Sequence, residues 1–261
     1  MMRSLWTGAT GMVAQQLNID VISNNLANVN TTGFKKSRAE FEDLMYQTMR
    51  MAGATTEGDN RLPVGIQVGM GTRPTAVHKF FTQGDFQNTG NTLDVAIEGD
   101  GFFQVDVNGE LMYTRAGSFK LNQDGTVVTA NGYILQPQFA VPAQTKTISI
   151  SSSGHMAAID AQGQELAGAE LPLYTFINPA GLDARGRNLY TPTEASGDAT
   201  EGVPGTDNVG TLAQGFLEMS NVEVVDEMVN MIVGQRAYEV NSKSIQTSDS
   251  MLGIAVQLKR S

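Results

Sequence analysis

Apolar side chains recur every seven residues at both ends of this chain, and this repeat limits its fold more than any other feature. We call each row of positions seven residues apart a helix seam. Near the N-terminus one seam is fully apolar and holds Leu5, Met12, Ile19 and Leu26. Near the C-terminus a five-member seam holds Val224, Met231, Tyr238, Ile245 and Leu252. Such a repeat is typical of an amphipathic helix that packs against other helices.

The second seam of each predicted helix is partly polar. Near the N-terminus it contains Gly8, Gln15, Ile22 and Val29. Near the C-terminus we assign it to Met228 and Val256, with the interruptions Gln235, Ser242 and Asp249. A narrow apolar stripe buries too little surface to stabilise an isolated helix. We therefore expect the two ends to form a coiled-coil-like stem, packing on each other and on neighbouring chains; the alternative is two surface helices flanking a globular core.

Turn signals mark the boundaries of these helices. Gly33 suits the end of the first helix because glycine adopts positive φ without strain. Asn221 is a candidate cap for the second helix, and acidic residues follow near its positive end.

The middle of the chain has the pattern of an antiparallel β structure. Apolar residues alternate over 103–107 and again over 111–113, and the turn dipeptides Asn108-Gly109, Asp124-Gly125 and Asn131-Gly132 follow at short intervals. Residues 146–177 form a second β-like stretch with a turn at Gln162-Gly163. Short strands with frequent turns predict an all-β domain of the barrel or sandwich type.

These patterns predict a mixed fold of four parts. We expect an N-terminal helix over 1–32, an extended connector or brace over 33–64, a central β domain over 65–217 and a C-terminal helix over 218–261. The polar, glycine-rich residues 194–211 read as a surface loop of the β domain.

Composition excludes several classes of function. The formal net charge is −10, and most of it falls in the middle of the chain, which disfavours nucleic acid and anionic membranes as partners. There is no cysteine, so neither a disulfide nor a thiolate metal site can form. No apolar run reaches the roughly 20 residues that span a membrane. The first residues lack the apolar core of a cleaved signal peptide, which predicts a cytoplasmic protein unless a dedicated export machine accepts it.

No pattern in the sequence predicts catalysis, a cofactor or a metal. The two histidines, His78 and His155, are not spaced as metal ligands. Gly99-Asp100-Gly101 lacks the third glycine and the helix of a nucleotide-binding loop. The acidic turns near Asp106 and Asp124 do not extend into a calcium loop. We interpret all of these as turn or surface residues.

One segment is not explained by turns or surface exposure. Residues 24–35 read NNLANVNTTGFK, with four asparagines in seven positions of an otherwise helical segment. Asn24, Asn28 and Thr31 or Thr32 would share one helix face. A strip of groups that both donate and accept hydrogen bonds suits the alignment of helices, at some cost in stability. The candidate assembly residues are Asn24, Asn25, Leu26, Ala27, Asn28, Thr32, Gly33, Phe34 and Lys35.

This segment closely resembles the signature of the flagellar basal-body rod and hook protein family. Residues 94–105 and 113–136 resemble the family's shared β module, and 221–252 resembles its C-terminal helix, so the resemblance covers both ends and the middle. Chain length and residues 41–54 favour the distal rod type; Ala52 stands where that type often has proline. A proximal rod or hook-type subunit is the alternative, and a β-module binding protein or enzyme with helical arms is the alternative of a different class.

The resemblance implies a structural subunit without a cofactor. It implies export without a cleaved signal through the flagellar export apparatus, followed by polymerisation into a rigid, periplasm-spanning helical tube that transmits motor torque and forms the export channel. The implied partners are further copies of the chain, the proximal rod subunit, the hook protein, the surrounding ring bushing and the rod-assembly cap. Neither nucleic acid nor membrane insertion is implied.

Overall fold

The computed structural model describes residues 2–53, 63–206 and 209–258, and the chain divides into two compact units. The first, called the helical unit below, comprises Met1–Leu26, Ser37–His78 and Val224–Ser261. The second, called the β module, comprises Ala27–Lys36 and Lys79–Glu223. The four parts predicted from the sequence, with boundaries at residues 32, 64 and 217, were defined by composition. The two units of the structure are defined by contacts. The two divisions differ most over residues 65–78.

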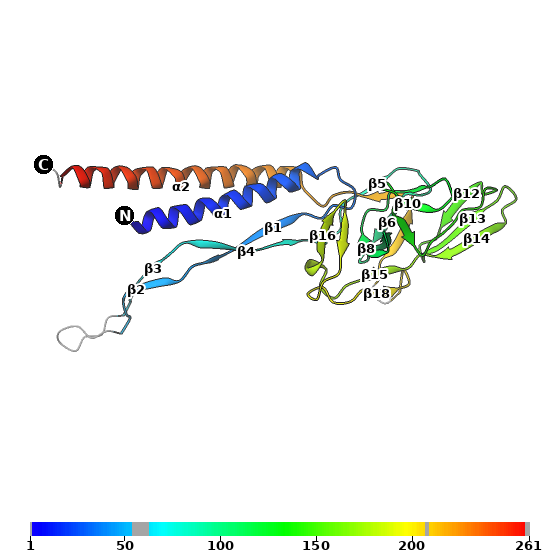
Figure 1. Ribbon diagram of the computed structural model, residues 1–261, viewed down its shortest axis with the longest axis horizontal. Coiled ribbons are helices and arrows are strands. Elements are labelled where there is room, and N and C mark those ends of the chain that lie inside the picture. Colours follow the sequence, from blue (N-terminus) through cyan, green and yellow to red (C-terminus); the bar gives the residue numbers. More distant parts are fainter. Residues whose placement is uncertain (1, 54–62, 207–208, 259–261) are drawn as a thin grey trace. The chain divides into compact units, whose positions relative to one another are not determined.

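Two antiparallel helices run side by side in the helical unit (Figure 1). They are α1 (Met2–Ala27) and α2 (Val224–Leu258). At one end the hydroxyl groups of Ser4 and Ser248 are hydrogen-bonded at 3.1 Å. At the other end Asn25 Nδ2 donates to Glu227 Oε2 at 3.4 Å. The predicted N-terminal and C-terminal helices are both confirmed.

Small residues let the two helices approach closely. A Cβ atom on Gly8 would lie 3.0 Å from Ile245 Cγ1, and one on Gly234 would lie 3.2 Å from Ile19 Cγ1. Both contacts are tighter than ordinary van der Waals packing, so a larger side chain at either glycine would push the helices apart.

The first helix ends earlier than the sequence indicated. It stops at Ala27, and a turn follows in which Thr31 N donates to Asn28 O and Thr31 Oγ1 donates to Asn28 Oδ1, both at 3.1 Å. Asparagine side chains compete with helical hydrogen bonds in this way. Gly33, at φ +69°, therefore serves a later turn and does not end the helix.

A two-stranded ribbon completes the helical unit. The strands β1 (Ser37–Asp43) and β4 (Thr72–Lys79) pair at its base, and β2 (Tyr46–Arg50) and β3 (Ile66–Gly69) pair farther out. The ribbon contacts α1: a Cβ atom on Gly71, at φ +114°, would collide with Thr10 Oγ1. The part of the predicted connector that covers residues 54–62 lies outside the described residues.

The β module is built mainly from short antiparallel strands. Its seven-stranded sheet has the order β16-β17-β8-β7-β11-β10-β9, and a three-stranded sheet has the order β12-β13-β14. Three two-stranded pairs, β15–β18, β19–β6 and β20–β5, accompany them, and no sheet of the described residues closes into a barrel. The elements are β5 (Phe86–Asn88), β6 (Val95–Glu98), β7 (Phe103–Val107), β8 (Glu110–Thr114), β9 (Phe119–Leu121), β10 (Val127–Thr129), β11 (Ile134–Gln136), β12 (Thr147–Ile150), β13 (His155–Ile159), β14 (Glu165–Glu170), β15 (Leu173–Thr175), a short 3-10 helix (Pro179–Gly181), β16 (Asp183–Gly186), β17 (Leu189–Thr191), β18 (Thr200–Gly202), β19 (Thr211–Gln214) and β20 (Phe216–Glu218).

The predicted turns connect consecutive strands. Asn108 and Gly109, at φ 57° and 90°, join β7 to β8 in a hairpin whose register pairs Val105 with Met112. Asp124-Gly125 lies between β9 and β10, and Asn131-Gly132 lies between β10 and β11. Residues 194–211 contain more structure than a surface loop, since β18 pairs with β15 and Ser196 is buried.

Two clusters form the core of the β module. The larger one draws residues from both larger sheets and includes Phe103, Val127, Leu135, Met156 and Leu173, all buried. The smaller one is aromatic and includes Phe102, Tyr113, Phe176 and Tyr190 with Phe81 against it. Its rings pack mainly edge to face, with centroids 5.0 to 6.0 Å apart. This packing favours a single rigid arrangement.

Candidate assembly surface

The asparagine segment binds the helical unit together through one residue. Asn25 is 1% exposed, and its side chain accepts from Ser37 N at 2.9 Å and donates to Ser37 O at 2.8 Å. The same amide nitrogen reaches Glu227 of α2. One side chain therefore joins α1, β1 and α2. Asn24 is exposed and Asn28 forms the turn after α1, so the alignment of helices that we expect from these two residues stays a prediction about contacts between copies.

The end of the motif lies in the β module. Gly33 N donates to Glu218 O at 2.8 Å, and a Cβ atom at Gly33 would lie 2.7 Å from Ala116 N. Positive φ and this backbone contact together require glycine. Phe34 is buried, with the Lys79 ammonium 5.1 Å from its ring centroid.

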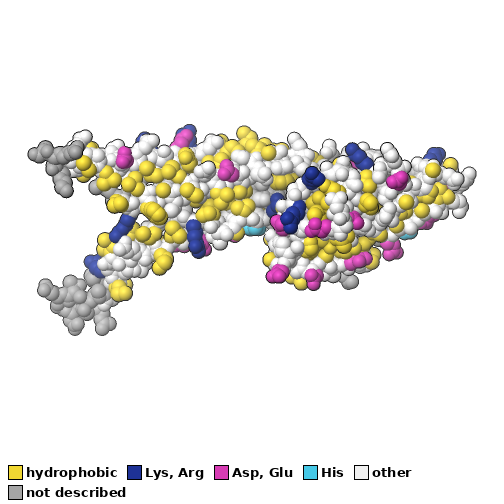
Figure 2. Space-filling view, in the orientation of Figure 1, with side chains coloured by type: hydrophobic (Ala, Val, Ile, Leu, Met, Phe, Trp, Pro, Cys, Tyr) yellow, Lys and Arg dark blue, Asp and Glu magenta, His cyan; other side chains and the backbone are white. Residues whose placement is uncertain are grey.

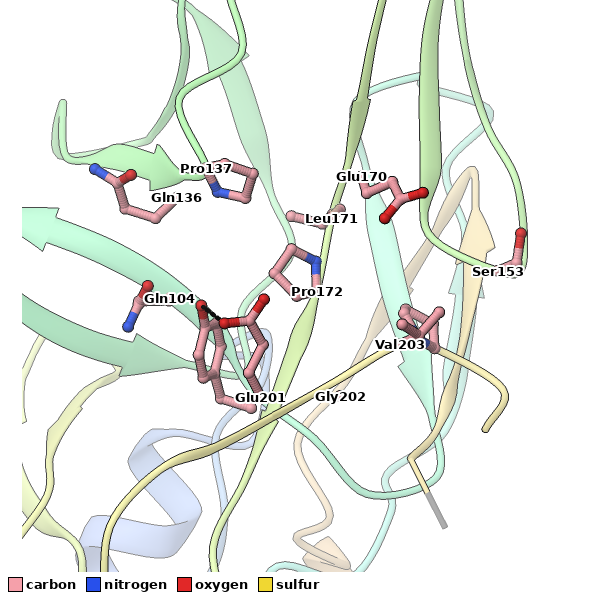
Figure 3. Close-up of a pocket in the computed structure, with 12 residues that line it drawn as sticks. Gln104, Gln136, Pro137, Ser153, Glu170, Leu171, Pro172, Glu201, Gly202 and Val203 are labelled. Atoms are coloured by element: carbon pink, nitrogen blue, oxygen red, sulfur yellow. Dashed lines mark hydrogen bonds between the residues drawn. The ribbon is translucent and has the colours of Figure 1, made fainter. Parts of the chain in front are cut away.

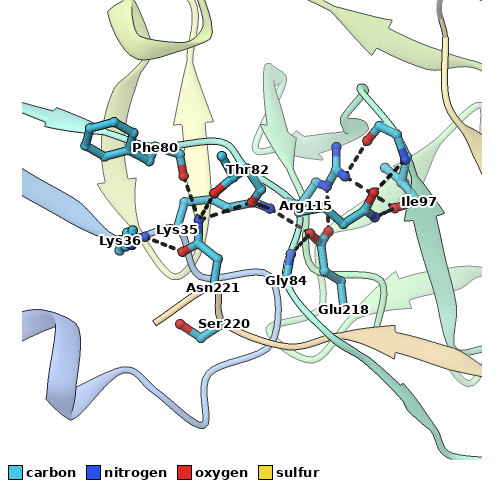
Figure 4. Close-up of polar contacts among 12 residues, drawn as sticks. Lys35, Lys36, Phe80, Thr82, Gly84, Ile97, Arg115, Glu218, Ser220 and Asn221 are labelled. Carbon is cyan, nitrogen blue, oxygen red and sulfur yellow. Dashed lines mark hydrogen bonds and ion pairs between the residues drawn. The ribbon is translucent and has the colours of Figure 1, made fainter. Parts of the chain in front are cut away.

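Lys35 forms a buried ion cluster with Glu218 and Arg115 (Figure 4). Lys35 is 0% exposed, and its Nζ lies 2.6 Å from Glu218 Oε1 and 2.7 Å from the carbonyl of Thr82. Arg115 Nε lies 2.6 Å from Glu218 Oε2. The remaining guanidinium donors reach the carbonyls of Gly101, Gly99 and Ile97. One carboxylate thus compensates two buried cations, while backbone carbonyls satisfy their other donors.

The electrostatics of this cluster follow from burial and charge. Burial opposes ionisation of Glu218, but Arg115 and Lys35 outweigh it and hold the pKa of that carboxyl below its usual value. Burial lowers the pKa of Lys35, and the Glu218 carboxylate counteracts this. The chain enters the β module near residue 35 and leaves it near residue 218. The ion cluster joins these two segments, and we call this place the junction.

The neighbouring polar contacts strengthen the same junction. Asn188 Nδ2 donates to Thr32 O at 2.9 Å. Asn221 Oδ1 accepts from Lys36 N at 2.7 Å, and Asn221 Nδ2 donates to Phe80 O at 2.9 Å (Figure 4). The interpretation of Asn221 as a helix cap is wrong, because its side chain is used within the β module instead.

The predicted helix seams occupy the contact between α1 and α2 only in part. Leu5, Met12, Ile19 and Leu26 of α1 are half-buried, as are Met231, Ile245 and Leu252 of α2. Val224 and Tyr238 are more exposed, at 39% and 41%.

The predicted second seam of α2 does not face α1. Met228 and Val256 are exposed. The contact with α1 is completed by residues three positions from the first seam: Glu227, Gly234, Asn241 and Ser248. They are small or polar, so a search for apolar repeats passes over them.

Large apolar side chains remain exposed over the helical unit. Figure 2 shows hydrophobic side chains gathered over both helices. On α1 they are Met2, Trp6 and Val13; on α2 they include Val225, Met228, Val229, Ile232, Val233, Val240, Met251 and Ile254; and on the ribbon they include Phe41, Met45, Tyr46, Met49 and Ile66. Contiguous apolar surface of this kind marks interaction sites in soluble proteins.

Neither histidine belongs to a metal site in the described part of the chain. His78 Nδ1 lies 3.1 Å from Glu40, and His155 Nε2 lies 3.1 Å from Glu165. No group of three His, Cys, Asp or Glu side chains among the described residues could hold a metal ion. No described helix is both long and apolar enough to cross a membrane.

Comparison with known protein families identifies three parts of this architecture. Residues 5–35, which cover most of α1 and the asparagine motif, match the model "Flagella basal body rod protein". Residues 96–158 of the β module match the "Flagellar hook protein FlgE/F/G D1 domain". Residues 213–258, which include the end of β19 and all of β20 and α2, match the C-terminal model of the FlgEFG basal-body rod proteins.

Whole-length relatives decide the family. A flagellar basal-body rod protein FlgG from Borreliella burgdorferi is 51% identical and covers 100% of both chains. The FlgG of Bacillus subtilis is 44% identical, also over 100% of both chains. The chain belongs to the flagellar basal-body rod protein family. It is a structural subunit of the rod in the flagellar basal body, and its whole-length similarity to FlgG proteins supports the distal rod type predicted from the sequence. A more distant relative, the hook-basal body complex protein FlhP of Bacillus subtilis, is 31% identical over 97% of this chain and 98% of its own.

Proposed function

We propose that this rod-family subunit polymerises into a rigid helical tube that transmits torque to the hook and encloses the export channel. The observation that carries the proposal is the exposed apolar surface of α1, α2 and the ribbon. In this arrangement the helices of many copies form a coiled-coil-like inner stem, and the β modules face outward.

The chemistry of the two faces of α2 supports this arrangement. The face toward α1 presents Gly234, Asn241 and Ser248, which let the two helices approach closely. Away from that contact, the first turns of α2 expose Val225, Met228, Val229, Ile232 and Val233, each by more than half. Covering such a side chain contributes roughly 1 to 2 kcal/mol. Covering several of these side chains would therefore contribute substantially to contacts between subunits.

We propose that the ribbon braces neighbouring subunits and stiffens the tube. All five residues of β2 are exposed, and Met45, Tyr46 and Met49 present flexible or flat apolar side chains that adapt to irregular partners. Paired strands resist bending better than an extended linker does. In this proposal residues 33–64 act as a connector that forms contacts between subunits.

The assembly motif and seams have distinct parts in the proposal. Asn24, Leu26, Ala27 and Asn28 belong to the surface of the stem. Asn25 sets the position of α1 against α2, and residues 32–35 fix the motif to the β module. The seam residues, Tyr238 above all, complete contacts with neighbouring helices.

The subunit's partners follow from its place in the rod. They are further copies of itself, the proximal rod subunit, the hook protein, the ring bushing, the rod-assembly cap and the export apparatus. The proposal contains no catalytic step, cofactor, nucleic acid or membrane insertion.

Polymerisation of the purified chain tests this proposal. The full chain should form straight filaments above a critical concentration in electron micrographs and sedimentation. Removal of both 1–30 and 224–261 should abolish them and leave a folded β module by circular dichroism. A full-length chain that stays monomeric, or trimmed chains that polymerise equally well, would overturn it. A monomer with hydrolytic activity would instead support a β-module enzyme with helical arms.

A further inference from the structure

A groove in the β module is lined by groups that accept hydrogen bonds and by rigid rings (Figure 3). Its volume is about 520 Å³, and its walls come from β7, β11 and β14, from the segments that follow β11 and β14, and from β15 and β18. Three prolines form part of the lining: Pro137, Pro172 and Pro204. Because proline backbone is stiff, the groove is largely preformed.

The polar groups of the groove form an acceptor-rich set. Figure 3 shows Glu170 and Glu201 on either side of Pro172. Both carboxylates are exposed, and neither forms an ion pair within the described residues. Tyr174 donates its hydroxyl to Glu201 at 3.4 Å, and burial, then the Glu201 charge, raises the pKa of Tyr174 to about 12.

Gln104 supplies a further acceptor. It is 8% exposed, lines the groove and uses its Nε2 to donate to Tyr113 at 3.1 Å. Its side-chain oxygen accepts no hydrogen bond from the described residues. An amide oxygen on a groove wall can accept a hydrogen bond from a donor of a ligand.

These features fit a guanidinium group better than a simple ion. Guanidinium carries five donors in one plane, binds carboxylates in pairs and stacks on aromatic rings. The groove offers two carboxylates, an amide oxygen and the ring of Tyr174. Among the described residues that line it there is no cation.

The same chain presents a matching arginine turn. Arg185 and Arg187 are exposed at the hairpin between β16 and β17, whose turn holds Arg187 and Asn188 at φ 55° and 59°. The Asn188 side chain anchors this turn to Thr32. Arg185 forms a surface ion pair with Asp183 at 3.2 Å, which is weak, and its Nε donates to Thr191 Oγ1 at 3.3 Å. Arg187 donates to Tyr133 and pairs with no carboxylate of the described residues.

The charge of the β module makes this turn distinctive. Residues 27–36 and 79–223 together contain 17 acidic and eight basic side chains. Of the eight, Lys35 and Arg115 are buried, Lys36 and Lys79 are half-buried, and two of the four exposed ones lie in this turn. Acidic modules side by side repel each other unless a specific contact reverses the interaction.

We propose that the groove receives the arginine turn, residues 185–187, of a neighbouring copy of this chain. This inference rests on the proposed polymer and adds a contact between its outer modules. The groove and the arginine turn are different patches of the chain. Each copy can therefore place its turn in the groove of one neighbour and receive the turn of another neighbour in its own groove. Such a heterologous contact propagates along a helical assembly without closing on itself.

Cross-linking tests the contact directly, since the chain has no cysteine of its own. Ala184→Cys places a thiol beside the turn, and Val203→Cys places one in the groove wall. Both substitutions leave the two carboxylates of the groove and the two arginines of the turn unchanged. Polymers grown from a mixture of the two variants and treated with a short bismaleimide should give covalent dimers. Each variant alone should not, nor should Val203→Cys mixed with Asp124→Cys, an exposed control position. Polymers that form without dimers above this control would overturn the proposal.

Charge exchange tests its energetics. Glu170→Lys with Glu201→Lys should raise the critical concentration about tenfold or more, as should Arg185→Glu with Arg187→Glu. Combining all four changes should restore it toward wild type. The matched control, Glu110→Lys with Asp124→Lys, changes net charge equally at exposed sites outside the groove and should have a much smaller effect.

The outcomes separate the two proposals. If wild type and every variant polymerise at the same concentration, the groove contact is wrong and the polymer stands. If both reversals weaken assembly but the combined variant does not recover, the two patches do not meet. A wild-type chain that never polymerises would overturn the proposed function and this contact with it.

Discussion

Replacing Glu218 with glutamine should destabilise the β module more than any other single charge change. Glu218 is 2% exposed and lies 2.6 Å from both Lys35 Nζ and Arg115 Nε. The substitution leaves two buried cations without a carboxylate. Removing one partner of a buried ion pair typically costs about 3 to 5 kcal/mol. That is a large part of the roughly 5 to 15 kcal/mol by which a domain of ordinary size is stable.

Urea unfolding followed by circular dichroism measures this loss. Glu110→Gln is the matched control, because Glu110 is exposed and lies outside the cluster, and it should change the free energy of unfolding by less than about 0.5 kcal/mol. Adding Lys35→Met to Glu218→Gln should recover part of the loss by removing one unpaired cation. A loss below about 1 kcal/mol for Glu218→Gln would refute the reasoning.

The lowered pKa of Glu218 predicts that the free energy of unfolding of the β module depends on pH. The carboxyl has a lower pKa in the folded protein than the usual 4.5. Its stabilisation is therefore complete above pH 4.5 and is lost as the pH falls through the folded-state value. The difference in unfolding free energy between wild type and Glu218→Gln should shrink over that acidic range and stay constant near neutral pH.

Three further results are expected. Tyr238→Asp should prevent filament formation in sedimentation while the circular dichroism of the β module is unchanged, since an unpaired charge in a helix contact is costly; normal filaments would show that Tyr238 faces elsewhere. In-register deletion of 47–64 should give curved or flexible filaments in electron micrographs, and filaments as straight as wild type would exclude the brace. In dilute monomer, hydrogen exchange should be fast over 1–30 and 225–261 and slow over 94–136, because the helices lack their neighbours; strong protection of both ends would contradict this.

Local signals in the sequence predicted much of the fold. Asn108-Gly109 specifies a hairpin within a few residues, and the two helices follow from repeats of apolar side chains. The contact between the two helices was harder to predict from the sequence. Gly234, Asn241 and Ser248 are small or polar, so they carry no apolar signal. The extent of α1 was overestimated because the asparagine side chains after Ala27 form a turn.

The buried ion cluster could not be read from the sequence. Lys35 and Glu218 are 183 residues apart, and Arg115 and Glu218 are 103 apart. Each is an ordinary charged residue in its own segment, and only the tertiary fold brings them together. Lys35 lies in the candidate assembly motif and Arg115 within a β-like stretch, but neither signal identifies a partner.

A density map of the assembled filament tests the central claim most directly. The account predicts that α1 and α2 of successive copies line the central channel, that the exposed side chains of α2 are covered by neighbouring subunits, and that the β modules form the outer layer. A map with β modules around the channel, or with the apolar face of α2 still open to solvent, would contradict it.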